Sequence, residues 1–321
     1  MVNRQRVRVD GRQLTVSNLD KVLFPDVSFT KAQVIDYYVR IAPVLLPHLS
    51  GRPVTFTRWP DGVEGQAFFE KNTARHAPDW VRRVTVPSPG STRDRETLEM
   101  VLLETVADLA WAANLAALEL HVPQWQVGSR LQPALPDLLV LDLDPGPNAG
   151  IRECCAVAER LRERLVDDGL DPVVKTSGSK GMQVYAPIRV TDREHPSRYA
   201  RHLAQELSAE TPDQVVWRME KVLRPGKVLV DWSQNNTAKT TVAPYSLRAR
   251  PDATVSTPIG WEEVDACEPD DFTVRTMPAR YRHVGDLHAG IDDAAYDVAE
   301  LLQWAQRDES EGLEQPTGED D

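Results

Sequence analysis

Two aspartates, Asp142 and Asp144, stand one residue apart at the end of an apolar run, Leu138-Leu139-Val140-Leu141, and Pro145-Gly146-Pro147 follows them. The run predicts a buried β-strand, in which residues i and i+2 point to the same face. Two crowded carboxylates repel, and burying them unpaired is costly. A divalent cation offsets that cost, and hard oxygen ligands suit magnesium or manganese in phosphoryl transfer. An Asp-rich turn after a strand would give the same pattern without a metal.

A second apolar strand, over residues 227–232, carries Asp231 near its end. A glycine-rich loop, Ser177-Gly178-Ser179-Lys180-Gly181, lies between two short predicted strands. This loop lacks P-loop spacing and no helix follows it. Its small residues still let backbone N–H groups approach an anion, although an ordinary glycine-rich hairpin is the alternative. Lys239 and Arg248 lie on later loops. Three acids for metals and several bases for a triphosphate are the inventory of a nucleotidyltransferase.

Other candidate residues have plain structural alternatives. Lys21 and Lys31 flank one loop and suit a phosphate, or they are simply surface residues. Phe68 and Phe69 are adjacent in a predicted strand, so their rings point to opposite faces and both cannot enter one core. An exposed ring beside Lys71 suits base stacking; the alternative puts one ring in the core and one under a loop. His121 comes shortly before the strand that carries the aspartates. One interpretation places it near the predicted metal site, and the other makes it a structural residue that forms hydrogen bonds.

The elements that must position these residues follow from periodicity and turn signals. We predict hairpins over 5–17 and 53–70, and helices over 31–46, 97–118, 151–168, 194–209 and 212–222. Ser28 or Thr30 is the expected cap of the first helix. We expect an α+β fold with a mixed central sheet flanked by helices and a smaller N-terminal region. Residues 1–300 form one domain in this interpretation, divided into an N-terminal region of about 1–130 and a catalytic core of about 131–300.

The charge distribution keeps nucleic acid as a candidate partner, despite a net charge of −12 over 321 residues. Residues 286–321 hold 12 acidic residues and one arginine, so the remainder is close to neutral. Residues 301–321 are predicted to be a disordered acidic tail. No apolar run is long enough to cross a membrane. Three cysteines without metal-ligand spacing indicate a reduced, cytoplasmic protein.

Taken together and in order, the motifs resemble those of archaeo-eukaryotic primase-superfamily polymerases. The similarity is greatest to the polymerase domain of bacterial end-joining ligases (LigD) and to stand-alone prim-pol relatives. It rests on Asp142-Leu143-Asp144, the Ser177–Gly181 loop and Val230-Asp231-Trp232-Ser233-Gln234-Asn235. Phe68-Phe69-Glu70-Lys71 and Ala243-Pro244-Tyr245-Ser246-Leu247-Arg248 match as well.

The resemblance implies a role for each candidate. Two divalent cations, Mn²⁺ or Mg²⁺, would be held by Asp142, Asp144 and Asp231. The incoming ribo- or deoxyribonucleoside triphosphate would contact Ser177, Ser179, Lys180, Gln183, Gln234, Lys239, Arg248 and His121. DNA would contact Lys21, Lys31, Phe68, Phe69 and Lys71, with the two N-terminal lysines gripping a 5′-phosphate across a gap or break. The implied function is template-directed, ribonucleotide-preferring primer extension in gap or double-strand-break repair, at the nucleoid. A separate DNA ligase and Ku are the implied protein partners.

The sequence departs from the family pattern at one position of this site. The family commonly reads Ser-Gly-Ser-Lys-Gly-Leu-His, and Gln183 stands where that histidine would be. Glutamine donates and accepts hydrogen bonds but carries no charge. The substitution therefore puts full catalytic efficiency in doubt. No Lys-x-Asp-Gly element of a ligase is present. We therefore expect a stand-alone polymerase or one encoded beside a separate ligase.

Rival functions remain within the enzyme class and outside it. Leu-Asp-Leu-Asp superficially fits a haloacid-dehalogenase-type phosphatase, but Gly146 stands where that family has threonine or valine, and the motif lies mid-chain. An inactive relative that only grips DNA ends is the binding-module alternative. De novo priming is a variant of the polymerase hypothesis.

Overall fold

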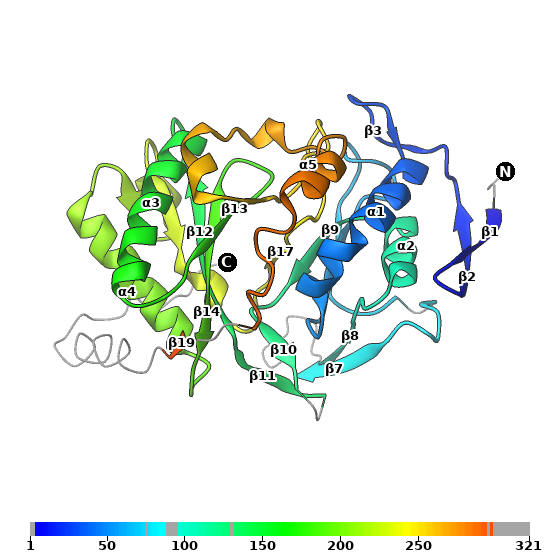
Figure 1. The fold of residues 1–321 in the computed structure, drawn as a ribbon, viewed down its shortest axis with the longest axis horizontal. Helices are drawn as coiled ribbons and strands as arrows, with labels where there is room; N and C mark the ends of the chain where they lie inside the picture. The colour runs from blue at the N-terminus through cyan, green and yellow to red at the C-terminus, as the bar shows by residue number, and fades with distance from the viewer. Residues whose placement is uncertain (1–3, 75, 88–95, 129–130, 294–295, 298–321) are drawn as a thin grey trace.

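The computed structural model describes residues 4–74, 76–87, 96–128, 131–293 and 296–297. Two sheets organise them (Figure 1). The larger sheet has the strand order β15-β16-β12-β14-β13-β18, with β19 beside β14, and the smaller has the order β17-β9-β5-β6. Most pairings are antiparallel, whereas β15 with β16 and β14 with β19 are parallel, so the larger sheet is mixed as predicted. The predicted tail, 301–321, lies outside the described residues.

The strands of the larger sheet are β12 (Leu138–Pro145), β13 (Val173–Thr176), β14 (Met182–Arg189), β15 (Val215–Val216), β16 (Val228–Asp231), β18 (Pro258–Ile259) and β19 (Tyr296–Asp297). Those of the smaller sheet are β5 (Thr55–Arg58), β6 (Phe68–Glu70), β9 (Ala117–Val122) and β17 (Thr241–Val242). Four further pairs are β1 (Arg4–Val9) with β2 (Arg12–Ser17), β3 (Val22–Phe24) with β4 (Phe29–Thr30), β7 (Arg83–Pro87) with β8 (Thr97–Val101), and β10 (Trp125–Val127) with β11 (Pro133–Pro136).

The α-helices are α1 (Lys31–Leu49), α2 (Val106–Asn114), α3 (Ile151–Asp167), α4 (His195–Glu210) and α5 (Met277–Val284). Short 3₁₀ turns cover η1 (Lys221–Leu223), η2 (Trp232–Asn235), η3 (Trp261–Ala266) and η4 (Pro269–Asp271). Thr30 caps α1 in a capping box with Gln33, so the second of the two candidate caps is used. No helix in the described part of the chain is long and apolar enough to span a bilayer.

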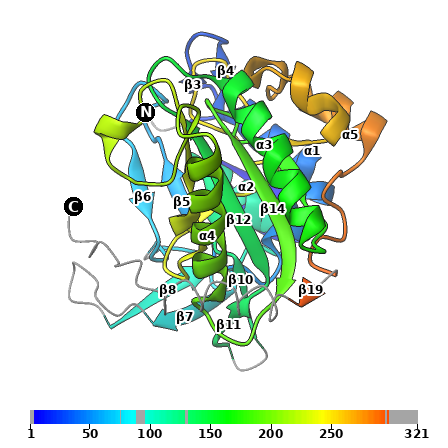
Figure 2. The same ribbon diagram turned by 90° about the vertical axis from the view of Figure 1, so that its left-hand side faces the viewer.

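Strand β12 has two different faces because its residues alternate. Leu139, Leu141 and Leu143 join the main hydrophobic core, to which α3 and α4 also contribute (Figure 2). Leu138 and Val140 face the other side and form a small cluster with Tyr185. Asp142 and Asp144 continue this second face, so the helices on the first face leave the carboxylates uncovered.

Two predicted helices are wrong. Residues 97–118 form β8, the short α2 capped by Thr105, and the start of β9, because β8 pairs with β7 and β9 pairs with β5. Residues 212–222 form β15 and η1, where Val215 and Val216 pair with β16 instead of continuing a helix. In both places tertiary strand pairing overrides the local apolar spacing.

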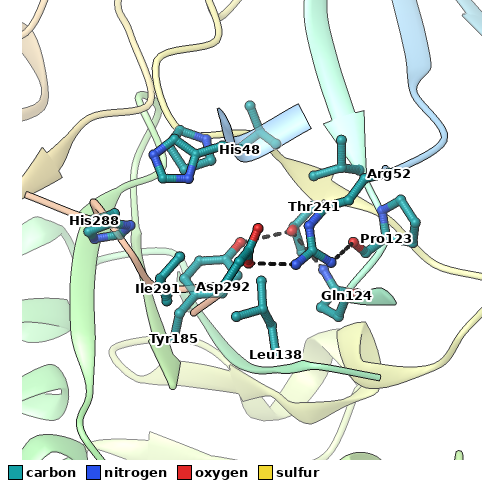
Figure 3. Close-up of a pocket in the computed structure, with 13 residues that line it drawn as sticks. His48, Arg52, Pro123, Gln124, Leu138, Tyr185, Thr241, His288, Ile291 and Asp292 are labelled. Atoms are coloured by element: carbon teal, nitrogen blue, oxygen red, sulfur yellow. Dashed lines mark hydrogen bonds and ion pairs between the residues drawn. The ribbon is translucent and has the colours of Figure 1, made fainter. Parts of the chain in front are cut away.

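A buried arginine ties the N-terminal half to the rest of the chain. Arg52 is 1% exposed and binds Asp137 through two hydrogen bonds of 2.8 and 2.9 Å. It also donates to Asp292 at 2.7 Å, beside a small cavity of about 30 Å³ (Figure 3). These contacts connect positions 85 and 240 residues apart in sequence.

Replacing this arginine should destabilise the fold. We expect Arg52→Met to lower the free energy of unfolding by about 3 kcal/mol, because it leaves two half-buried carboxylates without their cation. Urea denaturation measures this loss. Arg40→Met is the control: Arg40 forms an exposed i,i+4 pair with Asp36, so its loss should cost less than about 0.5 kcal/mol. Equal effects of the two substitutions would contradict the structural role of Arg52.

Candidate functional site

The three aspartates meet where β12 pairs with β16. Asp142 lies directly opposite Asp231 in the antiparallel register, and Asp144 lies two residues further along the same face. One carboxylate oxygen from each residue lies within 4.8 Å of the others. Asp231 is buried, Asp142 is half-buried and Asp144 is exposed, so the cluster opens to solvent on one side. Three residues from two strands thus form one acidic cluster.

The electrostatics of this cluster favour a cation. Burial and then the charge of Asp144 raise the pKa of Asp142 to about 7. Burial and then the charge of Asp231 raise the pKa of Asp144. Both shifts mean that the carboxylates hold more negative charge than their surroundings stabilise. Oxygen-only ligands of this kind fit a divalent cation, and the prim-pol domain generally uses divalent metals.

Neutral donors fix the orientation of the carboxylates. Gln183 lies opposite Asp142 on β14, and its Nε2 donates to Asp142 Oδ1 at 3.0 Å. On the other strand, Asp231 accepts hydrogen bonds from the Ser233 hydroxyl at 2.6 Å and from Gln234 Nε2 at 2.8 Å. Among the described residues, neither Asp142 nor Asp231 has a cationic side chain in an ion pair with it, so neutral donors alone orient these carboxylates.

The Ser177–Gly181 loop packs directly against the aspartate strand. A Cβ added to Gly181 would lie 1.9 Å from the carbonyl oxygen of Leu143, which only glycine avoids. Gly178 has φ +67°, and an added Cβ would lie 2.7 Å from the Arg248 side chain. The Ser177 hydroxyl accepts from the backbone N–H groups of Ser179 and Gly181. The loop is therefore closely fitted beside Leu143, and the Lys180 side chain at its tip is exposed.

Arg248 joins this loop to the smaller sheet. Its guanidinium donates to the Ser177 carbonyl at 2.9 Å and to Glu119 Oε1 at 3.0 Å. Glu119 also binds His121 at 2.9 Å. Burial raises the pKa of Glu119, but the His121 hydrogen bond and the charge of Arg248 outweigh it and lower that pKa to about 2. Glu119 was not among the residues predicted from the sequence, where its only signal is its place two residues before His121 on β9.

His121 is placed beside the aromatic residues, and it is not among the metal-ligand candidates found in the described residues. Its ring makes an edge contact with Phe69 at 6.5 Å. Phe68 and Phe69 are 41% and 58% exposed, so the alternative that put one ring in the core is wrong. Lys71 follows with Nζ 5.9 Å from the Phe69 ring centroid, and it donates to the Ala238 carbonyl. Lys239, the next residue along, is exposed and donates to the Ser233 hydroxyl beside Asp231.

The two N-terminal lysines form a separate cationic group. Lys31 is 6% exposed and donates to the Ser17 carbonyl at 2.8 Å, whereas Lys21 pairs with Asp61 at 2.6 Å. Burial, then the charges of Lys21 and Arg58, lower the pKa of Lys31 to about 8. Arg58 was not among the residues predicted from the sequence; it lies on β5, and its charge contributes to the lowered pKa of Lys31.

Another missed residue lies beside the carboxylates. The charge of Arg224 lowers the pKa of Asp144, although burial of that carboxyl has the larger and opposite effect. Arg224 Nε is buried and has no hydrogen-bond partner among the described residues. The signal was available in Leu223-Arg224-Pro225-Gly226-Lys227, a basic turn directly before the strand that carries Asp231.

Comparisons with known proteins agree with this geometry. Residues 30–288 match the family model described as "LigD, primase-polymerase domain". The chain is 42% identical to the multifunctional non-homologous end joining protein LigD of Mycolicibacterium smegmatis over 283 residues, which cover 87% of this chain and 36% of that protein. It is 31% identical to the bifunctional LigD of Bacillus subtilis, over 85% of this chain and 43% of that protein. The chain thus spans less than half the length of these relatives.

A solved structure resembles the whole fold. The polymerase domain of Mycobacterium tuberculosis ligase D in complex with DNA superposes with a TM-score of 0.82 and 40% sequence identity. The match covers 88% of this chain and 99% of that one. An α+β fold with an acidic cluster on the open face of a mixed sheet places the chain among the primase-polymerases. More narrowly, the chain belongs to the LigD primase-polymerase domain family.

The close packing of the loop generates a prediction. Gly181→Ala should lower the free energy of unfolding by about 1–3 kcal/mol and weaken triphosphate binding, because the new methyl group pushes the loop away from Leu143. Gly128→Ala is the control, since its added Cβ meets only an ordinary contact at 3.6 Å. Thermal melts and nucleotide titrations of both variants measure the difference. A Gly181→Ala protein with normal stability and nucleotide affinity would contradict the fitted position of the loop.

Proposed function

We propose that this domain transfers nucleotides to the 3′-hydroxyl of a DNA-bound primer under the direction of a template. The observation that carries the proposal is the meeting of three carboxylates beside the fitted Ser177–Gly181 loop. Carboxylates for cations next to donors for phosphates are the arrangement that phosphoryl transfer requires. Membership of the primase-polymerase family supports the same reaction. We also propose that residues 1–300 act as one domain.

Two divalent cations, manganese or magnesium, are the proposed cofactors, held by Asp142, Asp144 and Asp231. When bound, such ions lower the pKa of a hydroxyl nucleophile and neutralise phosphate charge. The protein contributes the orientation of the ligands. Gln183 and the Ser233–Gln234 pair hold the carboxylates of Asp142 and Asp231 in place by hydrogen bonds.

The proposed triphosphate site lies beside these carboxylates. The Ser177, Ser179 and Lys180 loop presents small polar residues and an exposed ammonium group. Arg248, fixed by Glu119, and Lys239, which contacts Ser233, approach from the other loops. Gln183, Gln234 and His121 complete the proposed nucleotide contacts. A preference for ribonucleotides is part of the proposal on family grounds alone.

We assign the DNA contacts to two surfaces. Phe68 and Phe69 present exposed rings for base stacking, with Lys71 beside them. Lys21 and Lys31 would hold a 5′-phosphate at the far side of a gap or break. The relative solved with DNA supports a nucleic-acid partner. Repair of gaps or double-strand breaks, with a separate ligase and Ku, is the proposed cellular setting.

The second candidate function is a DNA-end-binding module with weak or no catalysis. Gln183 favours it, because this side chain cannot act as a cation or a proton donor where the family commonly has histidine. The intact hydrogen bond from Gln183 to Asp142 favours the enzyme instead, since it keeps a metal-ligand candidate oriented.

Primer extension with labelled ribonucleotides and manganese tests the enzyme directly. We expect extension by the wild-type domain, and a loss of roughly two orders of magnitude or more in Asp142→Asn with DNA binding retained. Asp167→Asn, which changes an exposed carboxylate at the end of α3, serves as the control and should extend normally. DNA binding without extension by the wild type would establish the binding module. Retained extension in Asp142→Asn would remove the proposed metal site.

The pKa of Lys31 makes end recognition dependent on pH. Its folded-state pKa of about 8 lies below the usual value of 10.5, so the ammonium form dominates at pH 7 and is lost as the pH rises through 8. The affinity ratio of 5′-phosphorylated over unphosphorylated gapped DNA should therefore fall between pH 7 and pH 9. A bound phosphate raises the midpoint, because opposite charge favours the ammonium. Fluorescence titrations at several pH values measure the ratio.

Lys31→Gln provides the matched test of this assignment. Its affinity ratio should be lower at pH 7 and nearly independent of pH. If the wild type and Lys31→Gln show the same ratios throughout, Lys31 takes no part in phosphate recognition.

A further inference from the structure

A row of four side chains crosses the larger sheet. One of them is Lys175, a lysine that has no role in the proposed reaction so far. Lys175 on β13 lies opposite Gln183 on β14, and Gln183 lies opposite Asp142 on β12. Asp142 in turn lies opposite Asp231 on β16. Directly opposed residues of antiparallel strands share one face of a sheet. The Lys175 amine therefore lies on the same face as the carboxylates, on the far side of Gln183.

The surroundings of this amine are unusual for a lysine. Lys175 is completely buried, and its Nζ donates to the Ser256 hydroxyl at 2.5 Å. The Nζ also lies 5.7 Å from the centroid of the Tyr185 ring. Within the described residues it forms no ion pair. A buried ammonium without a carboxylate partner is expensive, so this residue does not stabilise the fold.

Charge around the amine couples it to the acidic cluster. Burial and the charge of Arg248 lower the pKa of Lys175 well below its usual value, and the charge of Asp142 opposes them. Reciprocally, the charge of Lys175 lowers the pKa of Asp142. The charged and titratable groups that interact electrostatically with the amine are Asp142, Arg248 and His288. The Tyr185 ring lies beside it. Added negative charge at the acidic cluster consequently favours the ammonium form.

We propose that Lys175 is a positioning residue for nucleotide binding, whose buried amine is protonated when the triphosphate binds and offsets its charge from behind Gln183. The inference rests on the proposed nucleotidyltransferase function. A buried charge acts in a medium of low dielectric constant, so it attracts the triphosphate more strongly than a surface lysine in water does. Gln183 lies between the amine and Asp142 in the row, and the two side chains form no ion pair in the described part of the chain.

The opposing explanation makes Lys175 a packing residue that anchors the segment 254–257. The Ser256 hydroxyl also donates to the Thr176 carbonyl at 3.1 Å, so this segment already has a link to β13 without the lysine. The two explanations differ in the sign of the stability change. Replacing a packing residue lowers the stability of the protein. Replacing a buried, unpaired lysine by methionine, whose side chain is of similar length, raises it.

Lys175→Met separates the two explanations. We expect its melting temperature to rise and its dissociation constant for a nucleoside triphosphate to increase about tenfold or more. Binding is measured with ATP and manganese on a templated primer that ends in a dideoxynucleotide, so that no transfer occurs. The KM for the nucleotide in extension assays should rise by a similar factor. Lys227→Met is the matched control: it removes a half-buried lysine that donates to the Pro212 carbonyl, and nucleotide affinity should stay unchanged.

The outcomes distinguish this inference from the function on which it rests. Failure of the wild-type domain to bind nucleotide would overturn the proposed function itself. Normal wild-type binding with equal affinity in Lys175→Met would overturn only the role of Lys175, as would a lower melting temperature with unchanged affinity. If Lys175→Met does not fold, Ser256→Ala tests the same placement, because it removes the hydroxyl that holds the amine. Unchanged affinity in Ser256→Ala would then reject the proposal.

Discussion

The repulsion between Asp142 and Asp231 is the constraint around which the site is arranged. Like charges directly opposite each other in an antiparallel pair destabilise a sheet, yet the register of β12 and β16 imposes this pairing. The neighbours respond with neutral donors: Gln183 binds one carboxylate, and Ser233 with Gln234 binds the other. A lysine or arginine in contact with the carboxylates would relieve the repulsion more fully. Its charge would also neutralise the carboxylates and so weaken their attraction for a metal ion. The strain is thus retained on the open face of the sheet, where a divalent cation can relieve it.

A second constraint is that the Ser177–Gly181 loop and the aromatic residues Phe68 and Phe69 belong to different sheets. Arg248 connects them, because one guanidinium reaches both the Ser177 carbonyl and the Glu119 carboxylate. Glu119 then reaches His121, whose ring contacts Phe69. A continuous chain of contacts therefore runs from the loop beside the metal-ligand candidates to an exposed ring suited to base stacking. Displacing any member would alter the spacing between the proposed triphosphate site and the surface proposed for DNA.

The sequence predicted the parts of this arrangement that depend on local signals. The apolar run before Asp142 and the hairpin predicted over residues 5–17 rest on strong local patterns, and both elements form. The mixed sheet was predicted as well. What failed depends on distant partners: residues 97–101 have helical spacing but pair with β7, and Val215 with Val216 pairs with β16. The register that sets Asp142 opposite Asp231, and the contact between Arg248 and Glu119 across 129 residues, leave no local trace in the sequence.

Gln183 and Lys175 are best understood together. Charged imidazole at position 183 would stand directly opposite a buried amine on β13, and two adjacent buried cations would each disfavour the charge of the other. An amide avoids this conflict. Its Nε2 donates to Asp142 and its Oε1 accepts from the Tyr185 hydroxyl, so both ends are satisfied without adding charge. A lysine buried in this row is therefore compatible with the neutral residue beside it. Gln183 does not by itself mark decay of the site, since the carboxylates and their remaining donors are all in place.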